Sequence, residues 1–371
     1  MVDIGIMSAV ALFLAIPASF FWGYVCDKTK HYKRFILLSF LASTALLYIF
    51  TLTASIAWLI VLYAIMSVFH AAHEAPKNVL IAELYTRGEW ERRFAFYEGL
   101  TEAGWLIGLL LGFVTSAYGF GAVNTLLLCS SLNLVALVMS LILVTDPLLV
   151  FERSLVSIEK SVGFASHGVF LASKMLDGIS VDERLRKENV TAFCGGLVLF
   201  SLATSILFTP MPVFVSNITK NAGLPESLVF AIFVLNSGGA VAGYFFAGNR
   251  SNERTGKVNV GRIAVFRSFL AFLLIAAIQV TLYNVALVTV ILILMGFAYA
   301  IFLVYTLSLS MELIPAGKAG LFNVLIGIGG ACGSFIGPFI AQAFESSGFI
   351  YAFMTAGFLF VASYVAFKIY A

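Results

Sequence analysis

The sequence predicts an all-α integral membrane protein built from two similar halves of six membrane-spanning helices, with about eleven of the spans present. Composition is the first reason: 61% of the 371 residues are hydrophobic and 11% are charged, whereas soluble proteins average about 25% charged residues. A chain with so little charge must cover a non-aqueous surface. The second reason is an internal repeat with a fixed offset.

The repeat links the two halves of the chain residue by residue. Gly23 recurs as Gly243 at an offset of 220 residues, while later matches are offset by 229. The nine-residue difference falls almost wholly in one loop, because Arg34 follows Gly23 by 11 residues and Arg262 follows Gly243 by 19. The chain is therefore two copies of one unit. The matches at an offset of 229 are Glu83, Gly104 and Gly108 with Glu312, Gly333 and Gly337.

Eleven apolar stretches are each long enough to cross a hydrocarbon core of about 30 Å as a helix. Threading them alternately places 21 of the 22 Lys and Arg residues on, or nearest to, one side, with Lys220 opposite. The positive-inside rule makes the basic side cytoplasmic, so a multi-pass plasma-membrane protein with an internal C-terminus is expected. The stretches are 4–25, 35–53, 56–84, 93–116, 121–144, 191–216, 227–247, 261–282, 285–309, 319–343 and 349–370.

These spans divide the chain into an N-terminal half bundle (1–144), a charged cytoplasmic linker with an amphipathic interfacial helix (145–190) and a C-terminal half bundle (191–371). In the second half 52 residues precede Gly243, whereas only 22 precede Gly23 in the first. The deficit of 30 residues equals about one spanning helix with its loop. We therefore expect the first helix of the unit to be missing, and a truncated gene model explains this most simply.

Residues 23–34, GYVCDKTKHYKR, resemble the signature loop of major facilitator superfamily (MFS) transporters, roughly G-x-x-x-D-[RK]-x-[GK]-x-x-[RK]-[RK]. The end of the third span, 81–84, resembles the end of the family's fourth helix, and 99–112 resembles its glycine-rich fifth helix. The resemblance covers essentially the whole chain. It implies an MFS-type bundle of two pseudo-symmetric halves and a permease of the secondary-transporter class.

The resemblance also implies a conformational latch. In the family the acid of this loop interacts with the facing half, and the arginine pairs with the acid that ends the fourth helix; here these would be Asp27, Arg34 and Glu83. In the second copy Ala247 replaces the acid, so that latch is degenerate. A plain positive-inside anchor is the alternative interpretation. The predicted latch comprises Gly23, Asp27, Lys28, Arg34 and Glu83.

Ionisable residues inside the third and fourth spans are the candidates for chemistry. His70, His73, Glu74 and Lys77 lie on or beside one face of the third span, and Glu102 lies at a depth similar to that of Glu74. Each such group costs at least about 2.5–3.5 kcal/mol in the bilayer unless it is paired or faces water. We expect these five side chains to line a cavity for substrate and a coupling proton. A self-neutralised structural cluster is the alternative.

Small residues and prolines indicate helix packing and gating. Glycines spaced four apart allow close helix approach, and proline bends or breaks a helix. In the sixth span a pair of prolines predicts a gate. Leu109 occupies the position where antiporters of the family carry proline, which leaves symport and antiport both open. The packing and gating set is Gly104, Gly108, Gly112, Pro210, Pro212, Gly333, Gly337 and Pro338.

The sequence therefore predicts a secondary transporter that moves a small solute by alternating access, with proton coupling as one option. We expect a monomer in the lipid bilayer, with no nucleic-acid partner and no cofactor. ATP hydrolysis is not expected, because the nucleotide-binding pattern GxxxxGK[ST] is absent. Two alternatives remain open: a membrane enzyme using His70, His73 and Glu74 as a metal or acid–base site, and a transporter-like sensor. No metal site is predicted, because HExxH is absent and Lys77 lies beside the cluster.

Overall fold

The computed structural model describes residues 2–29, 31–84, 89–144, 189–249, 253–278, 282–313, 320–344 and 347–370. Only the backbone is described for 27, 75–84, 90–91, 253–259, 282–283, 311–313 and 320–321. All regular structure in these ranges is helical, which confirms the all-α prediction. The helices are α1 (Val2–Thr29), α2 (Tyr32–Phe50), α3 (Ile56–Leu84), α4 (Trp90–Ala117), α5 (Ala122–Leu143), α8 (Val190–Phe208), α9 (Met211–Asn221), α10 (Ser227–Asn249), α11 (Glu253–Ala276), α12 (Leu282–Leu313), α13 (Gly320–Ala343) and α14 (Gly348–Tyr370).

Ten stretches of the described chain are long and apolar enough to cross a membrane, so the multi-pass prediction is confirmed. Helix α3 has the bounds of the predicted span 56–84. Helix α11 begins at Glu253, eight residues before the predicted span 261–282. The predicted linker lies outside the described residues as far as residue 188.

The sixth predicted span, 191–216, is divided into two helices. Helix α8 ends at Phe208, and Pro210 is the N-cap residue of α9, with Pro212 in the first turn of α9. Proline has no backbone N–H to continue a helical hydrogen-bond ladder but fits the first turn of a new helix. The two prolines therefore account for the break.

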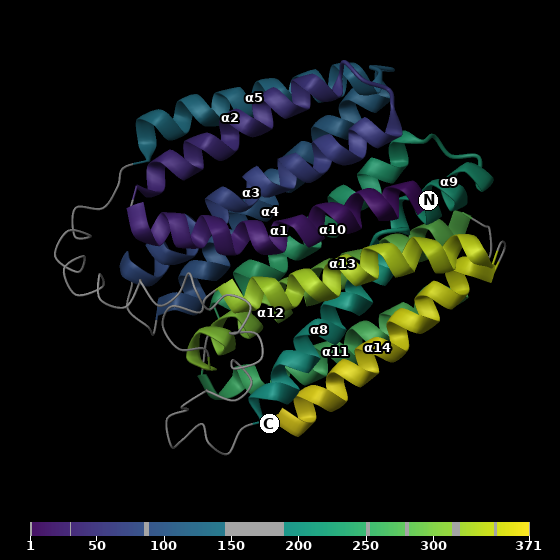
Figure 1. Ribbon diagram of the computed structural model, residues 1–371. Helices are drawn as coiled ribbons and strands as arrows, with labels where there is room; N and C mark the ends of the chain where they lie inside the picture. Colours follow the sequence, from purple (N-terminus) through teal and green to yellow (C-terminus); the bar gives the residue numbers. More distant parts are fainter. Residues whose placement is uncertain are drawn as a thin grey trace.

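Corresponding helices pack in corresponding pairs. In the first half α1 packs on α3 and α2 on α5; in the second half α10 packs on α12 and α11 on α14. Two further pairs, α1 with α13 and α4 with α10, join the halves. Figure 1 shows α2 and α5 along one side of the bundle and α8, α11 and α14 along the other. The internal repeat is thus visible in three dimensions.

Helix α8 covers one face of the second half and packs on both α13 and α14. Its approach to α13 is close: a Cβ at Gly333 would lie 2.5 Å from the carbonyl oxygen of Leu202, and one at Gly337 would meet the carbonyl of Ile206. The equivalent positions in the first half, Gly104 and Gly108, have no described atom within 4 Å of an added Cβ. The glycine pattern is repeated, but its packing is not.

The two ends of the bundle differ in the chain segments they carry. The C-terminus of α14 and the ends of α5 and α8 that flank the linker lie at one end, and the N-terminus and α9 lie at the other (Figure 1). At the α9 end Lys220 Nζ pairs with Glu226 Oε1 at 3.5 Å. This placement agrees with the predicted threading, in which Lys220 lies opposite the other cations.

Candidate functional site

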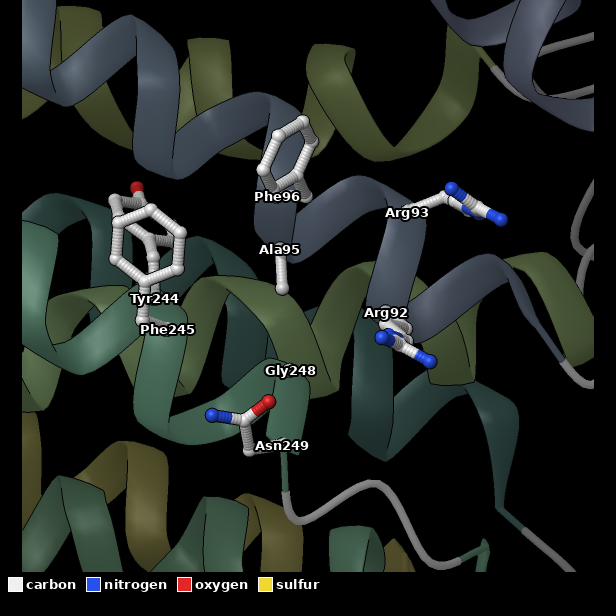
Figure 2. Close-up of a pocket in the computed structure, with 8 residues that line it drawn as sticks. All are labelled: Arg92, Arg93, Ala95, Phe96, Tyr244, Phe245, Gly248 and Asn249. Atoms are coloured by element: carbon white, nitrogen blue, oxygen red, sulfur yellow. The ribbon is translucent and has the colours of Figure 1, made fainter.

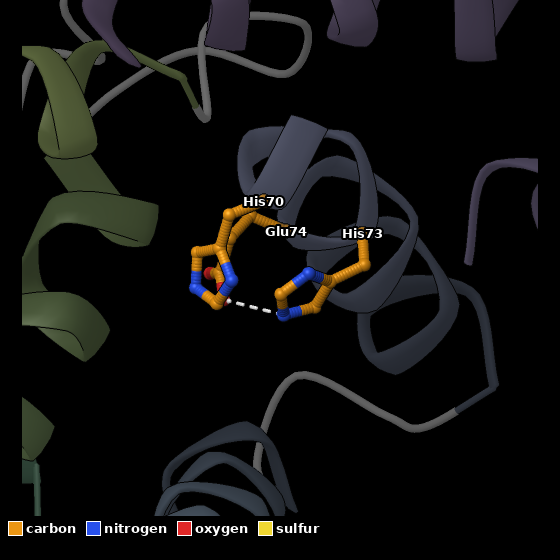
Figure 3. A group of neighbouring side chains, drawn as sticks. All are labelled: His70, His73 and Glu74. Atoms are coloured by element: carbon orange, nitrogen blue, oxygen red, sulfur yellow. Dashed lines mark ion pairs between the residues drawn. The ribbon is translucent and has the colours of Figure 1, made fainter. Parts of the chain in front are cut away.

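Three of the predicted site residues lie close together on α3. The candidate metal-ligating atoms of His70, His73 and Glu74 all lie within 4.8 Å of one another. His73 Nε2 lies 3.3 Å from Glu74 Oε1, and the two imidazole rings meet edge to face with centroids 4.4 Å apart. Figure 3 shows all three side chains on one side of the helix, with the carboxylate beside both rings. His70 is exposed, while His73 and Glu74 are partly buried.

Helix α2 holds one of these rings in place. The Ser39 hydroxyl and His73 Nδ1 are hydrogen-bonded at 3.2 Å, and Phe40 stacks on the same ring at a centroid distance of 6.3 Å. Because Ser39 is 2% exposed, this hydrogen bond lies in the packed α2–α3 contact. Sequence reasoning did not single out Ser39. Its helical spacing carries no signal that distinguishes it from an ordinary packing serine.

Glu102 lies at the contact between the halves. The Ser237 hydroxyl of α10 donates to Glu102 Oε1 at 2.6 Å and to the Glu102 carbonyl oxygen at 3.3 Å. Ser237 is 2% exposed, and Glu102 is partly buried. The carboxylate is therefore bonded across the halves rather than to the α3 group. A shared cavity for Glu74 and Glu102 stays a prediction.

A pocket of about 340 Å³ opens between α4 and α10 nearer the linker end of the bundle. Figure 2 shows Ala95 over Gly248, with the two arginines toward one end of the pocket and Tyr244 and Phe245 toward the other. A Cβ added to Gly248 would lie 2.9 Å from Ala95 Cβ, so the helices are in close contact beside the pocket. The lining residues are Arg92, Arg93, Ala95, Phe96, Tyr244, Phe245, Gly248 and Asn249.

The second half of the bundle contains a buried cation that the sequence analysis did not single out. Arg267 is 0% exposed, and none of its three guanidinium nitrogens has a hydrogen-bond partner among the described residues. Four aromatic rings surround its guanidinium carbon at 4.9–5.6 Å. Cation–π attraction of about 2 kcal/mol or more at desolvated sites partly offsets the cost of burial. The rings are those of Phe200, Phe208, Tyr299 and Phe360.

Arg267 occupies the place in the second half that Ser39 occupies in the first. Each lies five residues after the paired arginines Arg262 and Arg34. Its neighbour Tyr299 follows His70 at the offset of 229. In both halves, then, a polar side chain contacts the neighbouring helix at the same place in the repeat. Ser39 of α2 is hydrogen-bonded to α3, and Arg267 of α11 lies over an aromatic ring of α12.

The predicted latch falls partly outside the described side chains. Those of Asp27 and Glu83, and that of Lys77 in the α3 cluster, are not described. The helix α1 continues through this segment to Thr29, and Lys28 lies 6.0 Å from the Tyr24 ring. Arg34 is exposed near the start of α2. The latch stays a prediction.

The remaining packing residues lie between the halves. A Cβ at Gly112 would lie 3.1 Å from the Phe230 ring of α10. Pro338 is inside α13, and its Cγ would lie 3.0 Å from a Cβ at Gly5 of α1. Glycine and proline thus occur where α4 meets α10 and where α1 meets α13.

The comparisons with known proteins agree with this architecture. The Major Facilitator Superfamily model matches residues 2–338. A solved structure of a mutant form of the nucleoside transporter NupG is similar, with a TM-score of 0.68 and 14% identity over 100% of this chain and 91% of that one. A second NupG structure has a TM-score of 0.63 and 13% identity over 99% and 90% of the two chains. No curated protein matches. The NupG likeness shows the fold alone, whereas the family match over most of the chain shows that this protein belongs to the Major Facilitator Superfamily of transporters.

Proposed function

We propose that this chain carries a small solute across the plasma membrane by alternating access, with the two halves rocking about a central site. Family membership supports a secondary transporter. The supporting geometry is the pair of contacts between the halves, α1 with α13 and α4 with α10. In such folds the substrate binds between the repeats near the bilayer midplane, and rigid-body rocking exposes it to each side in turn.

The observation that carries the proposal furthest is the hydrogen bond between Glu102 and Ser237. It joins a carboxylate of one half to a hydroxyl of the other at 2.6 Å. An intramembrane carboxylate is costly, so it is placed where it has a partner or a proton to bind. Rocking that parts α4 from α10 would separate this pair. We assign Glu102 the role of coupling proton binding to movement between the halves.

The α3 residues are our candidates for the solute site, and the loop around Asp27 is our candidate latch. The NupG structures belong to a nucleoside transporter. At 14% identity that likeness does not extend to substrate, but nucleosides belong in a screen. A thermal-shift screen of the purified protein against nucleosides, sugars, amino acids, organic anions and drugs would identify a solute to use as the transport probe.

Glu102→Gln tests the coupling. In proteoliposomes loaded with the solute so identified, the variant should exchange labelled for unlabelled solute as wild type does. It should fail to accumulate solute when a pH gradient is imposed. Thr101→Val, which removes a neighbouring exposed hydroxyl bonded within its own helix, is the matched control. Full pH-driven accumulation by Glu102→Gln would refute the assignment, and the absence of counterflow in wild type would refute transport itself.

A further inference from the structure

His70, His73 and Glu74 present three metal-ligating groups to one point in space. Imidazole nitrogen and carboxylate oxygen are ligands that zinc binds at about 2.0–2.2 Å. In a tetrahedral site such bonds place neighbouring ligand atoms about 3.3 Å apart. His73 Nε2 and Glu74 Oε1 already have this separation, 3.3 Å. The full set lies within 4.8 Å, so His70 must approach by about 1.5 Å at most.

That adjustment is available to His70. The residue is exposed, and its ring meets the His73 ring edge to face. Rotation about its side-chain torsions can therefore bring a ring nitrogen toward the His73–Glu74 pair. His70 and Glu74 are four residues apart on one helix, a spacing that places two side chains on the same face. Figure 3 shows the two rings and the carboxylate gathered on that face.

The surroundings of His73 match those of a metal-bound histidine. Such a ligand commonly donates its second ring N–H to an oxygen, which fixes the tautomer and the ring orientation. When Nε2 coordinates an ion, Nδ1 carries the proton and donates to the Ser39 hydroxyl, 3.2 Å away. Phe40 stacks on the same ring and limits its rotation. Ser39 is therefore a positioning residue for this ligand.

The sequence alone predicted no metal site here, but the geometry of the three ligands favours one. We propose that His70, His73 and Glu74 bind one divalent transition-metal ion, with Zn²⁺ as the best-matched case. Three protein ligands leave a further position open to water or to a donor group of a solute, as in zinc sites that are not closed by a fourth side chain. Two neutral imidazoles and one carboxylate also leave a net positive charge at the ion. Ion binding is a property of the folded chain and is measured without transport. The metal-site proposal is therefore tested independently of the proposed transport function.

The test uses the full-length protein in detergent, freed of any polyhistidine tag and treated with chelator. Titration with Zn²⁺ by calorimetry, and with Co²⁺ by its visible absorption, should give one ion per chain. Variants His70→Ala, His73→Ala and Glu74→Gln should each lose stoichiometric binding. His31→Ala, which removes an exposed histidine at the start of α2, is the matched control and should bind as wild type does.

Ser39→Ala separates positioning from general packing. It should keep one ion per chain but bind it about 10–100-fold more weakly, as expected when a partner of a ligand histidine is lost. Zinc K-edge X-ray absorption of the wild-type protein provides a readout that needs no variant, and should show imidazole scattering at the bound ion. Wild type without a stoichiometric ion, a bound ion without imidazole scattering, or unchanged binding by folded ligand variants would each overturn the proposal.

Discussion

Alanine substitution at paired glycines tests whether the two halves are packed differently around the same motif. At Gly333 an added Cβ would lie 2.5 Å from the Leu202 carbonyl oxygen and 2.8 Å from Ser205 Cβ. Ordinary van der Waals contact begins near 3.5 Å, so α8 must move by close to 1 Å. At Gly104, the equivalent residue, no described atom lies within 4 Å of the added carbon.

These distances predict opposite signs. Gly333→Ala overpacks a closed contact and should cost about 1–3 kcal/mol. Gly104→Ala adds a methyl group to open space in a helix interior, where alanine is favoured over glycine by about 0.5–1 kcal/mol. Gly337 and Gly108 form a second such pair and should behave in the same way. The two variants of the first pair should therefore differ in stability by roughly 1.5–4 kcal/mol, the sum of these two ranges.

The assay is thermal unfolding in detergent, followed by tryptophan fluorescence and by the amount of monodisperse protein that survives heating. Gly333→Ala should lower the apparent Tm by several degrees, while Gly104→Ala should leave it unchanged or raise it. Equal losses for both variants would refute the reasoning. That result would mean that the Gly104 face is covered in the folded protein as tightly as the Gly333 face.

Two further predictions concern buried polar groups. Ser237→Ala should destabilise the protein by about 1–3 kcal/mol, because the Glu102 carboxylate loses its donor across the halves; the exposed-hydroxyl variant Thr101→Val should stay within about 0.5 kcal/mol of wild type in the same melting assay. Arg267→Met should melt at or above wild type, since it removes a buried charge that has no hydrogen bond to the described residues, while keeping most of the side-chain volume. Arg267→Ala should cost about 2–5 kcal/mol of stability through the cavity it leaves. A methionine variant as unstable as the alanine variant would show that the cation itself is needed.

The sequence was sufficient for the spans whose apolar runs end at clear polar boundaries. Helix α3 has its predicted bounds, Ile56–Leu84, because hydropathy and turn residues agree at its start and acidic and basic residues follow its end. Helix α11 begins at Glu253, eight residues before the predicted apolar span 261–282. Its first turns, from Glu253, are polar, so a hydropathy pattern excludes them although the backbone is helical.

Arg267 was missed because it lies about 9 Å into the predicted span 261–282, and the alternate threading assigned it to the basic end of the bundle. Charge alone could not reveal its aromatic surroundings, because the four rings come from α8, α12 and α14.

Ser39 and Ser237 were beyond sequence reasoning for a different reason. A serine hydroxyl in a membrane helix can bond to a carbonyl of its own preceding turn, as Ser310 does to Thr306, and that arrangement needs no partner helix. Whether it instead reaches a neighbour depends on the rotation of two packed helices. By contrast, the His70–His73–Glu74 group lies on one helix, so its spacing alone predicted that His70 and Glu74 share a face and that His73 lies at the edge of that face.

The contact surface between α4 and α10, called the seam from here on, holds contacts that must change when the halves move. Three of its contacts join small residues or glycine to an apolar group: Gly248 with Ala95, Gly99 with Tyr244 Cβ, and Gly112 with the Phe230 ring. Such contacts can slide or part with little specific loss, since no hydrogen bond is broken.

The Glu102–Ser237 bond lies on the same seam and behaves differently. A carboxylate parted from its hydroxyl donor in the membrane must find water, another donor or a proton. When α4 and α10 move relative to each other, the apolar contacts therefore change gradually, whereas the Glu102–Ser237 hydrogen bond is either formed or broken. An energetic step at a single polar contact is what a transporter needs if proton binding is to favour one arrangement of its halves over the other. We therefore expect substitutions at Glu102 to change the balance between the two arrangements more than any substitution at the seam glycines.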